Sequence, residues 1–348
     1  MTKRILWASL ALAPATILVD LLTGAGKVLL FILAAAALIP LAWLIGEATE
    51  HAAEHTGPGI GGFLNASFGN APELIIALFA VGDGLPQVVR GSLAGSVISN
   101  LLLVFGVTQV VGPERAINRR SLLAQLGLVA AAVALLVAPV WLGYTGDPER
   151  HTAVLVSIPI AVVLLGLYLA VTGRNLQEHR EAEREDRHEP SAGSWTLTTA
   201  LVALGIATGL TAIVSEILVH SLHAFAEAVG ATEFFIAAVI VAIVGNAAEH
   251  GGAIVIARAG KMKLASEIAV SSSAQVALLV APAVMLLSLF FTHQLPLSFR
   301  WEELVAMAGA VCLAAATIAD GSTKRWEGAM HVLAYAGVVI GFWFAGNR

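Results

Sequence analysis

Two glutamates lie in positions where a charged side chain is costly. Glu73 and Glu249 each fall well inside a run of apolar residues that is long enough to cross a bilayer. A charge at mid-membrane depth costs at least ~2.5 to 3.5 kcal/mol on insertion scales, so each carboxylate needs a neutralising partner. We place all 19 Lys and Arg residues in loops or at the ends of apolar runs, which leaves protons or a bound cation. These two options together predict a proton-coupled cation carrier.

Polar side chains accompany each glutamate at helical spacing. The first set is Asn70, Glu73, Ser96 and Ser99, and the second is Asn246, Glu249, Ser272 and Gln275. Each set consists of two pairs whose members are three residues apart, which places both members on one face of a helix. Each set therefore brings a carboxylate, an amide and a hydroxyl or second amide toward a common point.

These oxygen-bearing side chains predict the ion. Ca²⁺ takes six to eight oxygen ligands and accepts irregular geometry, so carboxylates mixed with amides and hydroxyls suit it. Cys312 is the only cysteine, and the nearest imidazole is that of His250. Soft metals are therefore less favoured, and Mn²⁺ is the alternative. We expect transported Ca²⁺ and H⁺ and no bound cofactor.

The two sets belong to an internal repeat with an offset of 176 residues. Residues 69–104 align without a gap with residues 245–280, and ten of these 36 pairs are identical. The first copy lies in the third apolar run and the second in the eighth, and this odd separation inverts the topology. Inverted repeats are typical of secondary transporters whose site lies where the halves meet. A purely structural bundle is the alternative, but it has no need for buried carboxylates.

Eleven apolar runs define the expected fold. They cover residues 5–22, 28–46, 59–81, 88–111, 122–142, 152–171, 195–220, 234–257, 264–291, 304–319 and 326–344. A helix needs about 20 such residues to cross a hydrocarbon core of roughly 30 Å. The sequence predicts an all-α polytopic membrane protein of about 11 transmembrane helices, arranged as one helix and two inverted five-helix repeats. A signal peptide is the alternative for the first run, but its apolar core would be unusually short.

The chain divides around its most polar stretch. An acidic linker at residues 173–194, which includes RNLQEHREAEREDRHEP, separates a first five-helix repeat at 27–172 from a second at 195–348. Residues 1–26 form the N-terminal transmembrane helix. The simple interpretation of the linker is a solvated cytosolic segment, and a regulatory ion-binding segment is the alternative.

The basic residues predict the orientation in the membrane. Fourteen of the 19 Lys and Arg residues fall on the side of the N-terminus, and five fall on the other side. This positive-inside bias predicts a cytosolic N-terminus and an outside C-terminus, with the cell (inner) membrane as the expected location.

The composition excludes several classes of protein. Hydrophobic residues make up 58% of the chain and charged residues 12%, whereas soluble domains have about 25% charged residues. The formal net charge of -5 offers no basic surface for nucleic acid. The expected partners are therefore the lipid bilayer, Ca²⁺ and protons. The oligomeric state stays open, with a homo-oligomer as one option.

One further motif suggests a different class. HAAEH at residues 51–55 matches the H-x-x-E-H pattern of inverted zinc proteases. An intramembrane zinc metalloprotease is thus a rival hypothesis, but it leaves the repeat unexplained. The other interpretation makes the acidic residues at this end of the second run, Glu50 and Glu54, part of an ion entrance. Glu216 and His250 are further candidates for that entrance.

A proline predicts a broken helix beside the first glutamate. Pro72 removes a helical hydrogen bond in the third run and should free backbone carbonyls toward the site. The second copy has Ala248 at this position. Unwinding there must come from Gly245 and from the glycine pair at 251–252, so we expect the two breaks to differ in detail.

Several motifs together are similar to one known family. They are GEATEH at 46–51, TGPGIGGFLNASFGNAPELI at 56–75, GSVISNLLLVFG at 95–106, SEILV at 215–219 and GNAAEH at 245–250. With these motifs the chain resembles the Ca²⁺/H⁺ exchanger branch of the cation/Ca²⁺ antiporter superfamily over nearly its whole length. Two positions depart from the family pattern. TEH at 49–51 stands where TEE or TES is usual, and SSS at 271–273 stands where GSS is usual.

The resemblance implies roles for particular residues. The implied Ca²⁺ ligands are two carboxylates, two amides and two backbone carbonyls, from Glu73, Glu249, Asn70, Asn246, Gly69 and Gly245. The implied partners of the protonated carboxylates are Ser99 and Gln275, with Ser96 and Ser272 beside them. The expected function is secondary active exchange of Ca²⁺ for H⁺ by alternating access, so the chain is not expected to be an enzyme. A Na⁺-coupled cation/Ca²⁺ exchanger is the alternative.

Overall fold

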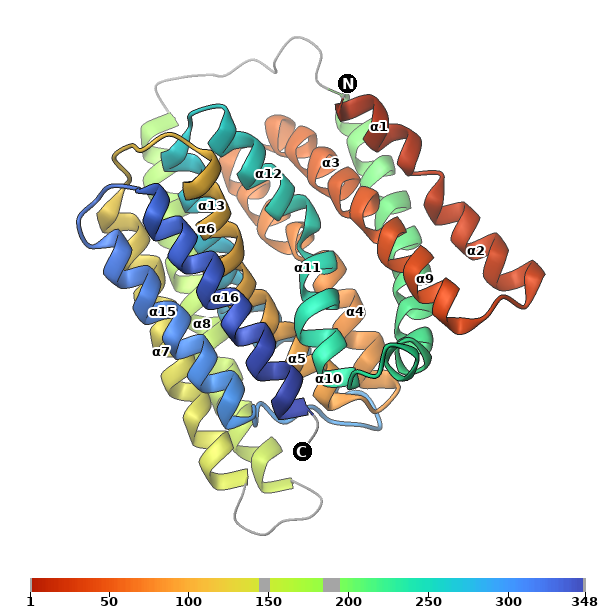
Figure 1. Ribbon diagram of the computed structural model, residues 1–348. Coiled ribbons are helices and arrows are strands. Elements are labelled where there is room, and N and C mark those ends of the chain that lie inside the picture. Colours follow the sequence, from red (N-terminus) through yellow and green to blue (C-terminus); the bar gives the residue numbers. More distant parts are fainter. Residues whose placement is uncertain (1, 144–150, 184–194, 347–348) are drawn as a thin grey trace.

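The apolar runs form a bundle of long helices. The computed structural model describes residues 2–143, 151–183 and 195–346, and Figure 1 shows the two ends of the chain at opposite ends of the bundle. The helices of the first part are α1 (Thr2–Ser9), α2 (Leu12–Thr23), α3 (Lys27–Gly69), α4 (Ala71–Gly82), α5 (Pro86–Ile98), η1 (Ser99–Val104), α6 (Phe105–Val111), α7 (Arg119–Gly143) and α8 (His151–Glu183). Those of the second part are α9 (Leu197–Val229), α10 (Glu233–Ile236), η2 (Ala237–Val241), α11 (Ala242–Gly245), α12 (Ala247–Arg258), α13 (Met262–Gln275), η3 (Val276–Val280), α14 (Ala281–Ser288), α15 (Trp301–Ile318) and α16 (Arg325–Gly346). The η segments are π-helical. The predicted linker lies partly outside the described residues, because α8 ends at Glu183 and the description resumes at Trp195.

Local sequence sets the bounds of the helices. α9 begins after Thr196, whose side chain accepts a hydrogen bond from the backbone N–H of Thr199 at 3.2 Å. It ends at Gly230, which has a left-handed φ of 70°. Thr232 caps the next helix in the same way, with the N–H of Phe235 as donor. The short Gly230–Thr232 turn therefore separates two helices whose ends are both fixed.

The helices are long and apolar enough to cross a membrane. Among the described residues nine helices meet this criterion, and the pair Glu233–Gly245 and Ala247–Arg258, bent by 58°, makes a tenth. The remaining expected run, the third along the chain at 59–81, is divided at Asn70. Its second half is α4, which has only twelve residues, and its first half belongs to α3. The all-helical membrane fold is thus confirmed, and the third run is a broken helix.

Contacts with α9 locate the broken run in the bundle. Phe31, near the start of α3, stacks on Phe225 with ring centroids 4.2 Å apart. Asp83, just after α4, lies 3.2 Å from His220, between one and two turns from Phe225 in α9. α4 therefore ends on the side of the bundle where α3 begins. The segment from Thr56 to Gly82 therefore crosses the bundle in the direction opposite to the first part of α3.

The first helix of each predicted half packs against its counterpart in the opposite direction. α9 runs along α3, with Phe225 stacked on Phe31 at one end and Trp195 stacked on His51 at the other. α3 and α9 are thus antiparallel neighbours, as an inverted repeat requires.

The halves approach closely at a glycine. A Cβ atom built on Gly95 of α5 would lie 2.0 Å from the carbonyl oxygen of Ala238 in η2. Any side chain there must push the two backbones apart. This contact joins the helix that carries Ser96 to the helix that leads to Glu249.

Gly95→Ala is expected to destabilise the protein, because overpacking a close backbone contact typically costs about 1–3 kcal/mol or more. The measurement is the thermal unfolding midpoint in detergent. Gly127→Ala in α7 is the matched control, because nothing lies within 4 Å of its built Cβ. Alanine should favour that helix by roughly 1 kcal/mol. Equal midpoints for Gly95→Ala and wild type would contradict the close contact.

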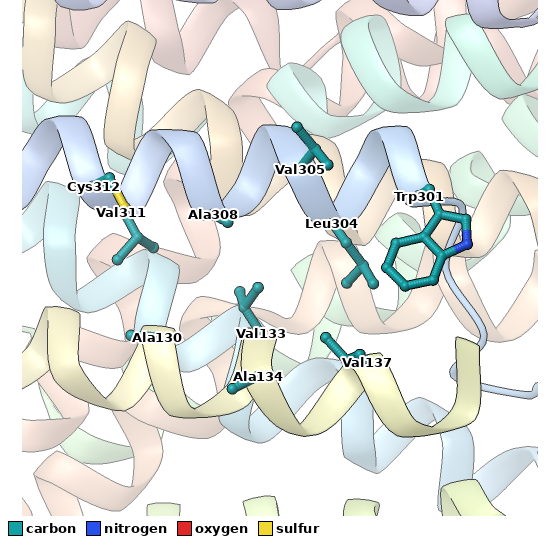
Figure 2. Close-up of a pocket in the computed structure, with 10 residues that line it drawn as sticks. All are labelled: Ala130, Val133, Ala134, Val137, Trp301, Leu304, Val305, Ala308, Val311 and Cys312. Atoms are coloured by element: carbon teal, nitrogen blue, oxygen red, sulfur yellow. The ribbon is translucent and has the colours of Figure 1, made fainter. Parts of the chain in front are cut away.

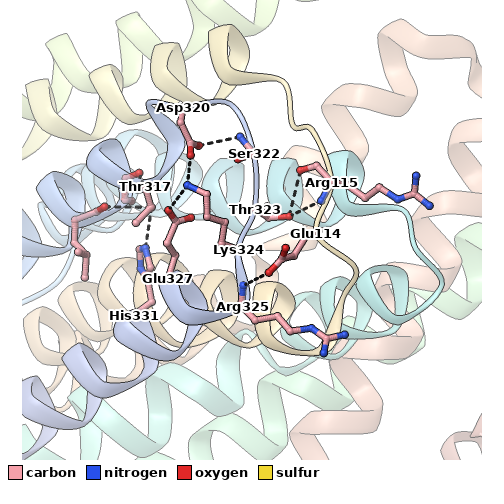
Figure 3. Close-up of polar contacts among 12 residues, drawn as sticks. Glu114, Arg115, Thr317, Asp320, Ser322, Thr323, Lys324, Arg325, Glu327 and His331 are labelled. Carbon is pink, nitrogen blue, oxygen red and sulfur yellow. Dashed lines mark hydrogen bonds and ion pairs between the residues drawn. The ribbon is translucent and has the colours of Figure 1, made fainter.

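Two loops from different halves are joined at one end of the bundle. Ala116 and Ser322 form an isolated antiparallel bridge. Beside it, the N–H of Thr323 donates to the Arg115 carbonyl at 3.0 Å, and the N–H of Arg115 donates to the Thr323 hydroxyl at 3.2 Å (Figure 3). The α6–α7 connection is therefore held against the α15–α16 connection.

Charged side chains support the second of these loops. Lys324 donates to Asp320 and, at 3.1 Å, to Glu327 (Figure 3). The hydrogen bond from Lys324 holds the pKa of Asp320 below its usual range, and the bond to Asp320 raises the pKa of Lys324. Both groups are therefore charged near neutral pH.

The outer face of the bundle is apolar. α7 and α15 border a groove of about 350 Å³ (Figure 2). Its lining is Ala130, Val133, Ala134, Val137, Trp301, Leu304, Val305, Ala308, Val311 and Cys312. Such an exterior is what a membrane protein presents to lipid.

Candidate functional site

Each of the two glutamates lies in the first turn of a helix that follows a break. α3 ends at Gly69 and α4 begins at Ala71, while Asn70 between them has φ −95° and ψ 11°. α11 ends at Gly245 and α12 begins at Ala247, and Asn246 has φ −100° and ψ 12°. Carbonyls at a helix C-terminus lack the partner that the next turn would supply, so each break places oxygen acceptors beside a carboxylate.

The Asn residues at the two breaks have nearly the same backbone angles, although only one of the breaks contains a proline. Pro72 lies in the first turn of α4, where a proline is tolerated, and Ala248 occupies the equivalent position in α12. The expected break at Pro72 is confirmed. The second break follows Gly245, as expected, and it differs in detail because the π-helical η2 and the short α11 precede it. The glycines at 251–252 do not unwind the helix, because they lie inside α12.

Glu73 is held by neutral donors from both halves. Its side chain is buried, and Oε1 accepts hydrogen bonds from the Ser96 hydroxyl and the Asn246 amide. The Asn246 Nδ2 atom also lies 2.9 Å from the Ser96 hydroxyl oxygen. No described residue donates to the buried Glu73 Oε2. One carboxylate oxygen is therefore in place for a proton or a cation.

Glu249 occupies the equivalent position in the second half, but its surroundings differ, because Asn70 donates to Gln275 and not to Glu249. Ser272, which is the repeat counterpart of Ser96, lies beside Glu249. No described residue donates to the buried Glu249 Oε2. The two carboxylates are close enough to repel each other electrostatically. Two like charges at such range in a low dielectric are costly unless a cation or protons are present.

Gly245 permits this approach of the two halves. A Cβ atom built on Gly245 would lie 3.0 Å from the Cγ atom of Glu73. The glycine that ends α11 therefore leaves space for the opposite glutamate.

The second amide also crosses between the halves. Asn70 Nδ2 donates to Gln275 Oε1 at 2.7 Å. Asn246 of the second half reaches Glu73, and Asn70 of the first half reaches Gln275. The candidate site is therefore one interlocked cluster rather than two independent groups.

The residues nearest the carboxylates are Ser96 and Ser272, and not Ser99 and Gln275 as the resemblance implied. Ser96 donates to Glu73 and Ser272 lies beside Glu249, whereas the Ser99 hydroxyl donates to the Ser96 carbonyl at 3.2 Å. Gln275 contacts Asn70 instead of a glutamate. The roles of Ser99 and Gln275 as partners of protonated carboxylates stay a prediction.

Both helices that supply these serines change to π-helix at nearly the same point. η1 begins at Ser99, and η3 begins at Val276, one residue after Gln275, the repeat counterpart of Ser99. π-Helical turns are rare and are frequent at functional sites. No local sequence pattern predicts these π-helical turns.

The candidate entrance residues differ in exposure. His250 is buried, and its Nε2 lies 3.0 Å from Asn100 Oδ1. The side chains of Glu50 and Glu54 in α3, and of Glu216 in α9, are exposed. An entrance formed by these four residues stays a prediction.

The HAAEH motif is engaged in other contacts. His51 stacks on Trp195 with ring centroids 4.8 Å apart, and His55 Nε2 lies 2.6 Å from the Trp195 carbonyl oxygen. Within the described parts of the chain no three His, Cys, Asp or Glu side chains are placed to hold a metal ion. The geometry does not assemble the zinc site that a protease would need.

One buried charge pair was missed in the sequence. Arg90 lies near the start of α5, as expected, but it is only 6% exposed, and its charge acts on Glu303 in α15, which is 1% exposed. The signal was available, because Glu303 falls close to the start of an apolar run. Arg90 is six residues from Ser96, so this pair lies nearly two helical turns from the carboxylate cluster.

Comparison with known proteins adds to this geometry. The sodium/calcium exchanger protein family matches residues 26–176 and 199–344. The Ca²⁺/H⁺ antiporter ChaA of Bacillus subtilis (strain 168) is 41% identical over 326 residues, which cover 90% of this chain and 91% of that protein.

Solved structures have the same architecture. The crystal structure of the Ca²⁺/H⁺ antiporter protein YfkE matches with a TM-score of 0.82 and 36% identity, covering 98% of this chain and 99% of that chain. The structure of the H⁺/Ca²⁺ exchanger CAX matches with a TM-score of 0.75 at 16% identity, covering 99% and 92%, and supports the fold alone.

Proposed function

We propose that this chain, which belongs to the sodium/calcium exchanger protein family, exchanges Ca²⁺ for H⁺ across a membrane by alternating access. It is an integral membrane transporter and not an enzyme. One observation carries the proposal. Glu73 and Glu249, one from each inverted half, lie in a single cluster of neutral polar side chains, and each has a buried carboxylate oxygen to which no described residue donates.

The cargo follows from charge balance. Two carboxylates carry two negative charges, which one Ca²⁺ or two protons neutralise. An empty and doubly ionised site is unfavourable, so the site crosses the membrane either loaded with Ca²⁺ or protonated. This preference couples the two fluxes and prevents leakage. Two protons per Ca²⁺ is the simplest ratio.

The proposed ligands are all oxygen atoms. The carboxylates of Glu73 and Glu249 are central, the side-chain oxygens of Asn70 and Asn246 are beside them, and the carbonyls at the ends of α3 and α11, including those of Gly69 and Gly245, complete the set. This donor set suits Ca²⁺, and Mn²⁺ is the second divalent ion that it accepts.

The two breaks give the halves a means of switching access. In each break a single Asn joins two helices, so a change in its backbone angles reorients the helix that carries the glutamate. Hydrogen bonds from Asn246 to Glu73 and from Asn70 to Gln275 link the two movements. The domains that move are the repeats at 27–172 and 195–348, preceded by the helix at 1–26 and joined by the acidic linker.

The orientation determines the direction of transport. The described basic loop residues Arg115, Lys261 and Lys324 belong to the side on which the sequence places the N-terminus, which supports a cytosolic N-terminus in the cell membrane. With a more acidic exterior, inward H⁺ flow then drives Ca²⁺ out of the cytosol.

The proposal predicts Ca²⁺ uptake into liposomes that contain only this protein when a pH jump makes their interior acidic. Uptake should proceed without Na⁺, and a Na⁺ gradient should add nothing. His51→Ala/His55→Ala is the control against the protease hypothesis and should alter uptake at most modestly. Uptake only with a Na⁺ gradient would establish the sodium-coupled alternative, and no uptake under either gradient would overturn the proposal.

A further inference from the structure

The π-helical segment beside the site leaves one backbone carbonyl outside the helical hydrogen bonding. In an α-helix the N–H of Phe105 would donate to the carbonyl of Leu101, four residues earlier. Here it donates to the carbonyls of Asn100 and Leu102 instead. The Leu101 carbonyl is therefore passed over at the point where η1 returns to α-helix. In a membrane protein such a group needs another donor.

A histidine from the last helix supplies that donor. His331 of α16 places Nδ1 3.0 Å from the Leu101 carbonyl oxygen. A carbonyl only accepts, so Nδ1 carries the hydrogen. Nε2 lies 3.0 Å from the Thr317 hydroxyl oxygen of α15 (Figure 3). The imidazole thus bridges three helical segments through two directed hydrogen bonds.

The surroundings of the imidazole are tightly packed. His331 is 0% exposed, and the Phe105 ring meets it edge to face with centroids 5.3 Å apart. One turn away, a Cβ built on Gly328 would lie 2.6 Å from the Gly106 carbonyl oxygen. α16 is therefore pressed directly against the π-helical segment, so the donor at residue 331 has little freedom to move.

The carbonyl that His331 holds is close in sequence to the site. Ser96, which donates to Glu73, lies five residues before Leu101, and Asn100, which contacts His250, lies one residue before it. A π-bulge adds one residue to a turn. If the bulge relaxed to α-helix, residues on one side of it would rotate by about 100° relative to those on the other. The bulge therefore determines which side chains of this helix face the carboxylates together.

We propose that His331 is a positioning residue for transport, because its Nδ1–H holds the Leu101 carbonyl and so maintains the π-helical register in which Ser96 and Asn100 face the opposite half. The role rests on the proposed exchange function and involves no change in the protonation of the imidazole. His331 touches neither glutamate, so it acts only through the helix that it supports.

Three variants separate this role from simple packing. His331→Leu removes the donor but still fills the space with an apolar side chain, whereas His331→Asn supplies an amide N–H near the position of Nδ1. The matched control is His293→Leu, in an exposed loop. We expect His331→Leu to raise the apparent KM for Ca²⁺ by about tenfold or more, per folded transporter, because small displacements of site groups have large effects. His331→Asn should recover most of the loss, and His293→Leu should match wild type.

The outcomes decide between the two roles. Wild-type KM in His331→Leu, with only a lower yield of folded protein, would mean that the histidine is merely structural. An Asn variant no better than the Leu variant would also overturn the proposal, because the directed hydrogen bond would then be irrelevant. Absence of proton-driven uptake in wild type would instead count against the exchange function.

A measurement without transport keeps the proposal testable in that last case. Hydrogen–deuterium exchange of the full-length protein in detergent reports on the backbone amides of residues 99–108. His331→Leu should accelerate exchange there, while His331→Asn and His293→Leu should leave it as in wild type. Equal exchange in all four proteins would overturn the assignment.

Discussion

Glu73→Gln or Glu249→Gln is expected to lower Ca²⁺ uptake by about a hundredfold or more. The amide keeps the shape of the side chain but removes the negative charge that attracts Ca²⁺, and it cannot take up and release a proton as the carboxylate does. Removing one partner of a buried charge interaction costs about 3–5 kcal/mol, which corresponds to roughly 10²–10⁴ in affinity. The measurement is the initial rate of pH-driven ⁴⁵Ca²⁺ uptake in proteoliposomes at matched protein content.

The control for this pair is Glu302→Gln, a carboxylate in the first turn of α15 that is exposed. It loses the same charge away from the cluster and should transport as wild type. A Glu73→Gln or Glu249→Gln protein that transported at full rate would remove the two glutamates from the mechanism.

The apparent affinity for Ca²⁺ is expected to fall by about a hundredfold for each pH unit of acidification, in the range where both carboxylates bind protons. The sign follows from competition, because two protons must leave before one Ca²⁺ enters. Affinity should become independent of pH once both groups are ionised. Equilibrium ⁴⁵Ca²⁺ binding to the purified protein across a pH series gives the slope.

The Gln variants provide the comparison for this slope. With one titrating carboxylate left, whatever binding remains should change by about tenfold per pH unit. An affinity that did not depend on pH would contradict competition at a shared site.

Much of the fold can be predicted from the hydropathy of the sequence and from its internal repeat. Apolar runs of membrane-spanning length predict helices without reference to the rest of the chain, and the repeat at an offset of 176 residues predicts the inverted halves. The antiparallel packing of α3 on α9 agrees with that expectation. The broken third run is harder to predict, because its division at Asn70 depends on backbone angles that a hydropathy pattern does not encode.

The two breaks illustrate a limit of local rules. Pro72 is a sufficient cause for a break in isolation, but α12 begins after an equivalent break with Ala248 in place of the proline. Tertiary contacts hold both Asn residues in the same conformation, since Asn246 is bound to Glu73 and Asn70 to Gln275. Long-range partners of this kind are absent from any local sequence signal.

The candidate site was predicted as a set of residues but not as a set of contacts. Helical spacing grouped Ser96 with Ser99, and Ser272 with Gln275, without showing which member of each pair meets a carboxylate. The π-helical turns explain the difficulty, because they change the register directly after these residues and ideal 3.6-residue periodicity does not describe them. Arg90 and Glu303 were missed because each is near the end of a run, where burial depends on the neighbouring helices.

The amide of Asn246 in one copy binds the acid of Glu73 in the other, so the duplicated segments are no longer separable chemical units. A substitution in one copy changes the environment of the opposite glutamate. A residue that differs between the copies, such as Ser99 and its counterpart Gln275, must therefore remain compatible with its contacts in the opposite half. A dimer of the first half alone would have no Gln275 to accept the hydrogen bond from Asn70.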